Sequence, residues 1–204
     1  MRLWTVQPID VWTQLQSEGF IYVDPLRINP EGEIYPQIEW LACRLRERIA
    51  DSSGHLPWFA YCERPDLRWI RHSRPKGSQE VLIEFEPPDD ALIAFPCWAW
   101  DDVFCGQYLT FTRTDSITWK RRLKDATGIS FEGRDGELPE PWSSELEASW
   151  HRLFLPDLPP QSWRRKRETV VDFKKKREAV VEVLRAQWVR QVQTFIGTWK
   201  FRKP

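Results

Sequence analysis

The sequence predicts an α+β fold: a single domain with a mostly antiparallel sheet, helices packed against it and a basic C-terminal element. Three observations lead to this prediction. Residues 81–86 alternate between two faces, as a half-buried strand does. Residues 37–49 repeat apolar side chains at three- and four-residue steps, as an amphipathic helix does. The length of 204 residues is typical of one domain.

In the N-terminal half, short strands and helices are predicted in turn. Residues 3–7 form an apolar segment that Pro8 stops, which fits a first strand. Asp10 can cap a helix that ends at Gly19. A loop with two prolines precedes the helix over 37–49. The remaining strands are expected at residues 20–23, in the first half of residues 57–71, at 81–86 and at 91–95.

In the C-terminal half, capping residues set the predicted helices. Asp115 or Ser116 can cap a basic helix that Gly128 stops. Ser144 and Glu147 form a capping box, which predicts a helix opening there and running to Phe154.

Residues 179–201 leave two interpretations open. Apolar side chains at helical spacing fit one long helix, and periodicity favours it. The Val-rich segment 180–192 could also form a strand, followed by a helical turn and a last strand over 198–202.

The net charge of zero conceals two opposite halves. Residues 1–160 form an acidic body with a net charge of −9, and residues 161–204 form a basic segment with a net charge of +9. Such a segment is typical either of a phosphate-binding face or of a helix that rests on the acidic body or on a partner chain. The candidate contacts with nucleic acid or a protein partner are Arg164, Arg165, Lys174, Lys175 and Lys176, together with Arg68 and Arg71.

The 13 tryptophans divide into two groups. Those on expected helices fit a core. Another set lies in stretches rich in Pro, Arg and Asp, and could line a pocket or stack bases beside Arg68, Arg71 and Arg74. This second set comprises Trp58, Trp69, Trp98 and Trp100.

Several classes of protein and site are disfavoured. The four cysteines lack the close spacing of a zinc site, so no metal is expected. No stretch approaches the roughly 18 apolar residues of a membrane helix, and no secretion signal opens the chain, so we expect a cytoplasmic protein that does not bind membranes. No phosphate-binding glycine loop, nucleophile elbow or kinase signature occurs.

Several segments together resemble the bacterial family known as domain of unknown function 3841. They are Leu3–Gln7, Trp12, Gly19, Pro65–Arg68, Val81–Asp90, Ser149–Phe154 and the C-terminal run from Trp188 to Phe201. The family tends to show Trp-His-x-Val-Leu-Asn where this chain has Trp100-Asp101-Asp102-Val103-Phe104-Cys105. The resemblance favours the strand interpretation of residues 180–192.

The order of elements is also similar to that of small ADP-ribosyltransferases. This similarity implies an NAD cleft between two sheets and a glutamate on a late strand that orients the reaction; Glu182 stands at that place. Trp4 and Thr5 occupy the position where those enzymes usually carry an NAD-binding Arg or His. Aromatic faces suit a nicotinamide ring, so the expected cofactor contacts are Trp4, Thr5, Trp58 and Tyr61.

Two functional hypotheses follow. One is an ADP-ribosyltransferase-like protein that uses NAD to modify a macromolecule, with Glu182 as the catalytic carboxylate. The alternative is a non-enzymatic module that binds nucleic acid or a protein through the basic segment and a surface lined by Trp and Arg.

Overall fold

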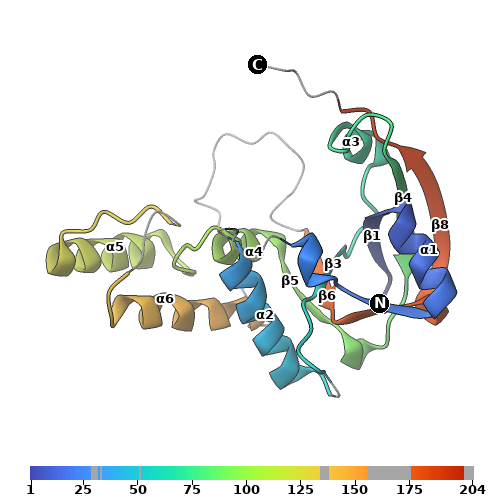
Figure 1. The fold of residues 1–204 in the computed structure, drawn as a ribbon. Coiled ribbons are helices and arrows are strands. Elements are labelled where there is room, and N and C mark those ends of the chain that lie inside the picture. Colours follow the sequence, from blue (N-terminus) through green and yellow to red (C-terminus); the bar gives the residue numbers. More distant parts are fainter. Residues whose placement is uncertain (29–31, 33, 51, 134–137, 156–175, 200–204) are drawn as a thin grey trace. The chain divides into compact units, whose positions relative to one another are not determined.

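The computed structural model describes residues 1–28, 32, 34–50, 52–133, 138–155 and 176–199 (Figure 1). The chain divides into two compact units. The sheet unit comprises Met1–Pro30, Glu39–Ala94 and Arg177–Pro204, and the helical unit comprises Glu31–Ile38 and Phe95–Lys176. The prediction of one domain over 1–204 remains a prediction.

The sheet unit contains a six-stranded sheet in the order β5-β6-β3-β1-β4-β8. The pairs β1–β3, β1–β4, β3–β6 and β4–β8 are all antiparallel. The α+β class and the mostly antiparallel sheet are thus confirmed. The strands are β1 (Leu3–Pro8), β3 (Trp58–Tyr61), β4 (Gln79–Phe85), β5 (Ile93–Pro96), β6 (Arg177–Val181) and β8 (Val189–Ile196).

Residues 180–192 contain parts of three strands and a 3₁₀ turn, so the long helix is wrong and the strand interpretation is confirmed in part. After β6, strand β7 (Val183–Arg185) pairs with β2 (Phe20–Tyr22) in a second, two-stranded sheet. A 3₁₀ turn over Ala186–Trp188 leads into β8. The apolar residues of β6 are buried on both faces of the sheet. A strand buried in this way has consecutive apolar residues and no alternation, so its sequence does not exclude a helix. The helical turn thus lies before residue 192 and not after it, and β8 runs to Ile196. Of the predicted last strand over 198–202, Thr198 is not in a strand, Trp199 forms an isolated bridge with Pro75, and residues 200–202 lie outside the described residues.

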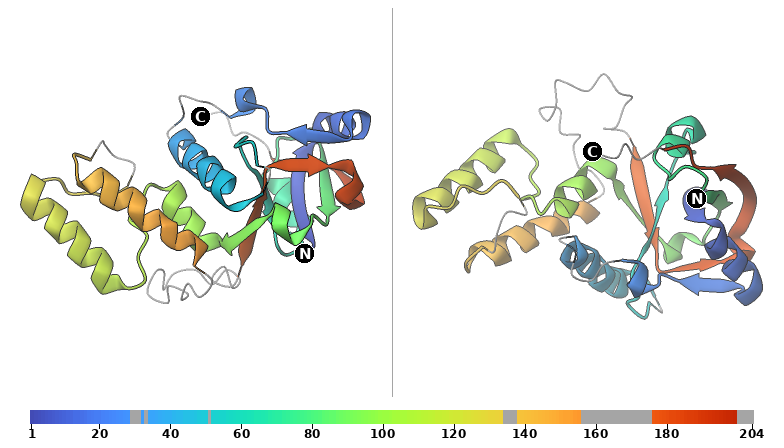
Figure 2. Two further views of the ribbon diagram at one scale, coloured as in Figure 1. Left: turned by 90° about the horizontal axis from the view of Figure 1, so that it is seen from below. Right: turned by 45° about the horizontal axis from the view of Figure 1, so that its top comes forward.

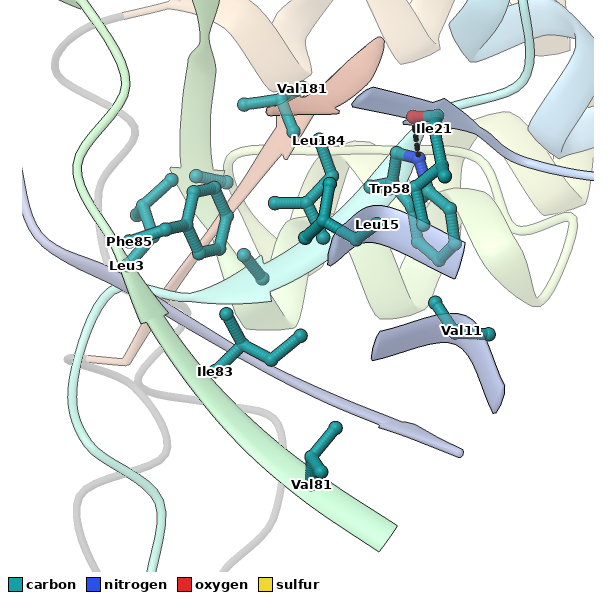
Figure 3. Packing of buried hydrophobic residues seen from close by; sticks show 12 residues of the cluster. Leu3, Val11, Leu15, Ile21, Trp58, Val81, Ile83, Phe85, Val181 and Leu184 are labelled. Carbon is teal, nitrogen blue, oxygen red and sulfur yellow. Dashed lines mark hydrogen bonds between the residues drawn. The ribbon is translucent and has the colours of Figure 1, made fainter. Parts of the chain in front are cut away.

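One face of the large sheet carries the main core. Helix α1 (Ile9–Glu18) buries Val11 and Leu15 in the cluster that holds Leu3, Ile83 and Phe85 of β1 and β4 (Figure 3). As expected, α1 ends at Gly19, which has the left-handed conformation with φ of 80°. A glycine adopts this conformation without the cost of a Cβ atom.

The opposite face carries a smaller cluster beneath helix α3 (Leu67–His72). Ile70 of α3 is buried together with Val6, Leu82 and Phe195. The sequence did not predict α3, because a six-residue helix is too short to show a periodic stripe. Its beginning is fixed by the Asp66 side chain, which accepts a hydrogen bond of 2.8 Å from the backbone N–H of Arg68.

The edge strand β8 is strongly curved, as its red ribbon shows in Figure 2. Its register with β4 shifts between Glu84 and Phe85, which pair with Gln191 and Val189. Arg190 is therefore the extra residue of a bulge, and bulges bend a strand locally.

The helical unit contains α4 (Cys97–Phe104), α5 (Arg113–Thr127) and α6 (Trp142–Trp150). Trp119 and Leu123 of α5 are buried with Phe131 and Trp142. The sequence did not predict α4. Helix α2 (Tyr35–Arg48) confirms the helix expected over 37–49; α2 and β5 cross the boundary between the units.

Both predicted caps in the helical unit are wrong. The cap of α5 is Thr112, whose hydroxyl accepts a 3.1 Å hydrogen bond from the N–H of Asp115. Helix α6 begins at Trp142, before the predicted capping box. The hydroxyls of Ser143 and Ser144 instead bond to Glu140 and lower the pKa of its carboxyl. The predicted stop of α5 at Gly128 is confirmed.

Candidate functional site

The large sheet opens between β1 and β3. Strand β1 pairs with β4 along all six of its residues, from Leu3 to Pro8. With β3, the described register is the single pair Trp4 and Tyr61. Beyond it, the hydroxyl of Thr5 donates a 3.1 Å hydrogen bond to the carbonyl of Phe59. Beyond the Trp4–Tyr61 pair, side chains therefore lie between β1 and β3, where a continuous ladder would have backbone hydrogen bonds.

A cavity of about 410 Å³ lies at this opening, entirely within the sheet unit. Its walls come from β1, the start of α1, the segment after β2, β3, β6 and the turn after α3. The lining residues are Thr5, Val6, Gln7, Pro8, Val11, Val23, Asp24, Ile28, Pro57, Trp58, Phe59, Ala60, Tyr61, Arg74 and Glu178.

Polar groups reach the cavity from both faces of the sheet. Since successive side chains of a strand point to opposite faces, Thr5 and Gln7 lie on the face of α1. The Gln7 amide donates a 2.8 Å hydrogen bond to the Thr5 hydroxyl, which fixes the direction of the Thr5 donor. Glu178 lies directly opposite Tyr61 in the β3–β6 register, so these two side chains share the other face.

Arg74 brings a positive charge to the cavity wall. Its backbone is held on both sides: its N–H donates to Arg71, and its carbonyl accepts a 2.8 Å hydrogen bond from the N–H of Trp199. Its side-chain Nε is buried and has no hydrogen-bond partner among the described residues. A buried donor without a partner costs free energy.

Three of the four predicted cofactor contacts line this cavity: Thr5, Trp58 and Tyr61. Trp58 is buried, and its indole N–H donates a 3.2 Å hydrogen bond to the carbonyl of Ile21. The fourth, Trp4, is not among the lining residues; its indole N–H donates to the carboxylate of Glu84 at 3.3 Å.

The predicted catalytic residue, Glu182, is not among the lining residues either. It lies between β6 and β7, is 8% exposed, and accepts hydrogen bonds from the backbone N–H groups of His55 at 2.7 Å and Ser53 at 3.1 Å. These contacts fix the segment before β3. The catalytic role of Glu182 remains a prediction.

The predicted basic contacts fall in different parts of the chain. Arg68 and Arg71 are exposed on α3. Lys176 is exposed just before β6. Arg164, Arg165, Lys174 and Lys175 lie outside the described residues.

The tryptophan set expected to line one surface has mixed burial. Trp58, Trp98 and Trp100 are buried, and Trp69 alone among the four is exposed, at 66%. Core packing therefore accounts for three of them.

Sequence reasoning missed Gln7 and Glu178 as cavity residues. A strand assigned to residues 177–181, which the sequence analysis did not give, would have pointed to Glu178, because antiparallel pairing with β3 sets it opposite Tyr61. Arg74 was expected beside the stretch rich in Trp and Arg, as a contact for bases; the structure places it at this cavity, in the turn after α3.

Two features are absent from the described residues. No group of three His, Cys, Asp or Glu side chains is arranged to hold a metal ion. No helix there combines the length and apolar character needed to cross a membrane.

Comparison with known families identifies a family model that matches most of the chain. The model of the family "Domain of unknown function (DUF3841)" matches residues 2–189. The chain belongs to this family. Comparison with curated proteins finds no match, and comparison with solved structures finds none. For this DUF3841 protein, the similarity to ADP-ribosyltransferases therefore remains a prediction, and the cavity is the feature on which a function can be argued.

Proposed function

We propose that the cavity between β1 and β3 binds NAD and that the protein transfers ADP-ribose to a macromolecule. The observation that carries the proposal is the opening of the large sheet after the Trp4–Tyr61 pair, with a cavity at that point. An NAD cleft at a division between sheets is what the similarity to small ADP-ribosyltransferases implies. The volume of about 410 Å³ lies within the range typical of small-molecule sites.

Arg74 is the proposed phosphate contact. Small ADP-ribosyltransferases usually carry this positive charge on the first strand, where this chain has Trp4 and Thr5. Here Arg74, in the turn after α3, is one of the residues that line the same cavity. A guanidinium suits charge-assisted hydrogen bonds to phosphate oxygens.

Glu178 is the proposed carboxylate of the reaction, and Tyr61 lies opposite it. When the bond between nicotinamide and ribose breaks, its electron pair leaves with the nicotinamide nitrogen and positive charge develops on the ribose. A carboxylate at the cavity wall stabilises that charge until an acceptor atom bonds to the ribose carbon and loses its proton. Tyr61, on the same face as Glu178, supplies aromatic surface for the nicotinamide ring.

The proposal is tested by calorimetric titration of the full chain with NAD and by transfer of labelled ADP-ribose. Arg74→Gln should weaken NAD binding roughly 10- to 100-fold, since it removes a charged hydrogen bond. Glu178→Gln should keep most of the binding and lose the transfer.

The matched control is Arg64→Gln. Arg64 is an exposed arginine near α3 whose guanidinium bonds Gln193 at 2.8 Å, and it is not among the cavity-lining residues. This variant should behave as the unaltered protein. Absence of NAD binding at millimolar concentration, or equal loss in Arg64→Gln and Arg74→Gln, would contradict the proposal.

A further inference from the structure

A basic and aromatic surface covers α3 and the chain that packs beside it; we call it the α3 patch. It is formed by exposed side chains from two parts of the sequence that meet at the turn after α3. Its members are Arg68, Trp69, Arg71, His72, Lys76 and Trp199.

The patch exposes indole rings that the core does not use. Trp69 is 66% exposed and Trp199 is 45% exposed. Most tryptophans near the sheet contribute to packing, whereas these two leave large apolar surfaces in water. An exposed aromatic surface bordered by charge is typical of a recognition site.

The charge of the patch is almost wholly positive. From Asp66 to Lys76 the sequence has four basic residues and one acidic residue. Asp66 pairs with Arg68 at 3.3 Å, and the Arg68 side chain remains 91% exposed. The backbone N–H of Arg68, followed by its side chain, lowers the pKa of the Asp66 carboxyl, so this counter-charge is ionised at neutral pH.

The backbone beneath the patch is firmly held. The N–H of Thr198 and its hydroxyl both donate to the carbonyl of Arg71, at 2.8 and 3.1 Å. Trp199 donates its N–H to the carbonyl of Arg74 and accepts from the N–H of Lys76, each at 2.8 Å. On its inner side, α3 buries Ile70. The two indoles are therefore displayed on a fixed frame.

We propose that the α3 patch binds single-stranded nucleic acid. Exposed indole faces stack with unpaired bases, and the guanidinium groups of Arg68 and Arg71 contact phosphates. A duplex keeps its bases stacked inside and offers only its phosphates to such a surface. Binding is measured without NAD, so its outcome does not depend on the function proposed above.

The test is fluorescence anisotropy of the full chain with a labelled single-stranded oligothymidylate and with a duplex of equal length. The single strand should bind more tightly than the duplex, with an affinity that falls steeply with salt. Trp69→Ala should weaken single-strand binding roughly 5- to 100-fold, because one stacking contact is lost. Arg71→Gln should reduce the steepness of the salt dependence by about 0.7, the contribution of one phosphate contact.

The charge control is Arg121→Gln, which removes an exposed arginine from the basic helix α5. It should leave binding unchanged. Both patch substitutions alter exposed side chains, and circular dichroism checks that the fold persists. Equal affinity for the duplex, full competition by polyglutamate, or loss of binding in Arg121→Gln alone would overturn the proposal.

Discussion

Glu178 and Glu182 lie four residues apart, yet the fold gives them different surroundings. Glu178 is half-buried at the cavity, opposite Tyr61. Glu182 is buried against backbone N–H groups of Ser53 and His55. The Glu182 carboxylate accepts hydrogen bonds from two backbone N–H groups, which indicates a role in stabilising the fold.

Replacing Glu182 by Gln should lower the free energy of unfolding by about 1–3 kcal/mol. The amide group offers one acceptor in place of two and sets a donor against a backbone N–H. Urea denaturation measures the change, with Glu178→Gln as the control. If Glu182 is instead the catalytic carboxylate, the substitution removes ADP-ribose transfer while the unfolding curve stays the same.

Cys62, at the end of β3, gives a pH-dependent prediction. Burial raises the pKa of its thiol from 9.0 to about 11. The unfolded chain ionises this thiol first, so the stability that the neutral thiol contributes is full below pH 9 and is lost as the pH rises towards 11. Urea denaturation between pH 8 and about 11 should therefore show a steeper loss than in Cys62→Ala.

Cys105→Ala is the matched control, because Cys105 is exposed. It should follow the unaltered protein over the same pH range. Identical curves for all three proteins would show that Cys62 ionises alike in the folded and unfolded chains.

At the scale of elements, boundaries follow capping groups more closely than periodic patterns. The ends of α1 and α5 are correctly predicted, because a glycine after the last helical turn commonly adopts the left-handed conformation that terminates the helix. The starts of α5 and α6 are wrong, because Ser, Thr and Asp compete for the capping position and neighbouring hydroxyls find other partners.

Gly19→Ala should destabilise the protein by about 1–2 kcal/mol. Its N–H bonds the carbonyl of Leu15 at 3.0 Å with φ of +80°, and a Cβ atom there would meet nothing within 4 Å. The cost is therefore that of the backbone conformation alone. Gly128→Ala, with φ of +77° and equally open surroundings, should cost the same. Thermal denaturation compares the two; a stabilised Gly19→Ala variant would contradict the left-handed assignment.

At the scale of the whole molecule, the sheet unit consists of three separate stretches of sequence. The longer stretch of the helical unit, Phe95–Lys176, is inserted between the second and the third of them. The two ends of that stretch are close together: the N–H of Cys97 bonds the carbonyl of Lys176 at 3.0 Å. An insertion with adjacent ends resembles a separately folding part.

Replacing residues 98–175 by a flexible linker of about four residues should leave the sheet unit folded. The shortened chain should unfold cooperatively and, if the cavity binds NAD as proposed, respond to NAD as the full chain does. Circular dichroism and calorimetry measure this. If residues 1–204 instead form one domain, the shortened chain should not fold.

The sequence by itself determined the fold class, helices α1 and α2, and the strands whose residues alternate between two faces. Burial of one face of an element requires apolar residues at a regular spacing, and that spacing is visible in the order of the residues. It also supplied Thr5, Trp58 and Tyr61 as candidates, through resemblance.

Tertiary structure alone decided the rest. It set strands and a 3₁₀ turn within residues 180–192, placed Arg74 and Glu178 at one cavity, and left Trp69 in water while burying Trp98 and Trp100. The physical reason is that strand pairing joins residues more than a hundred positions apart. No local pattern records which side chain will stand opposite another, or where a sheet will open.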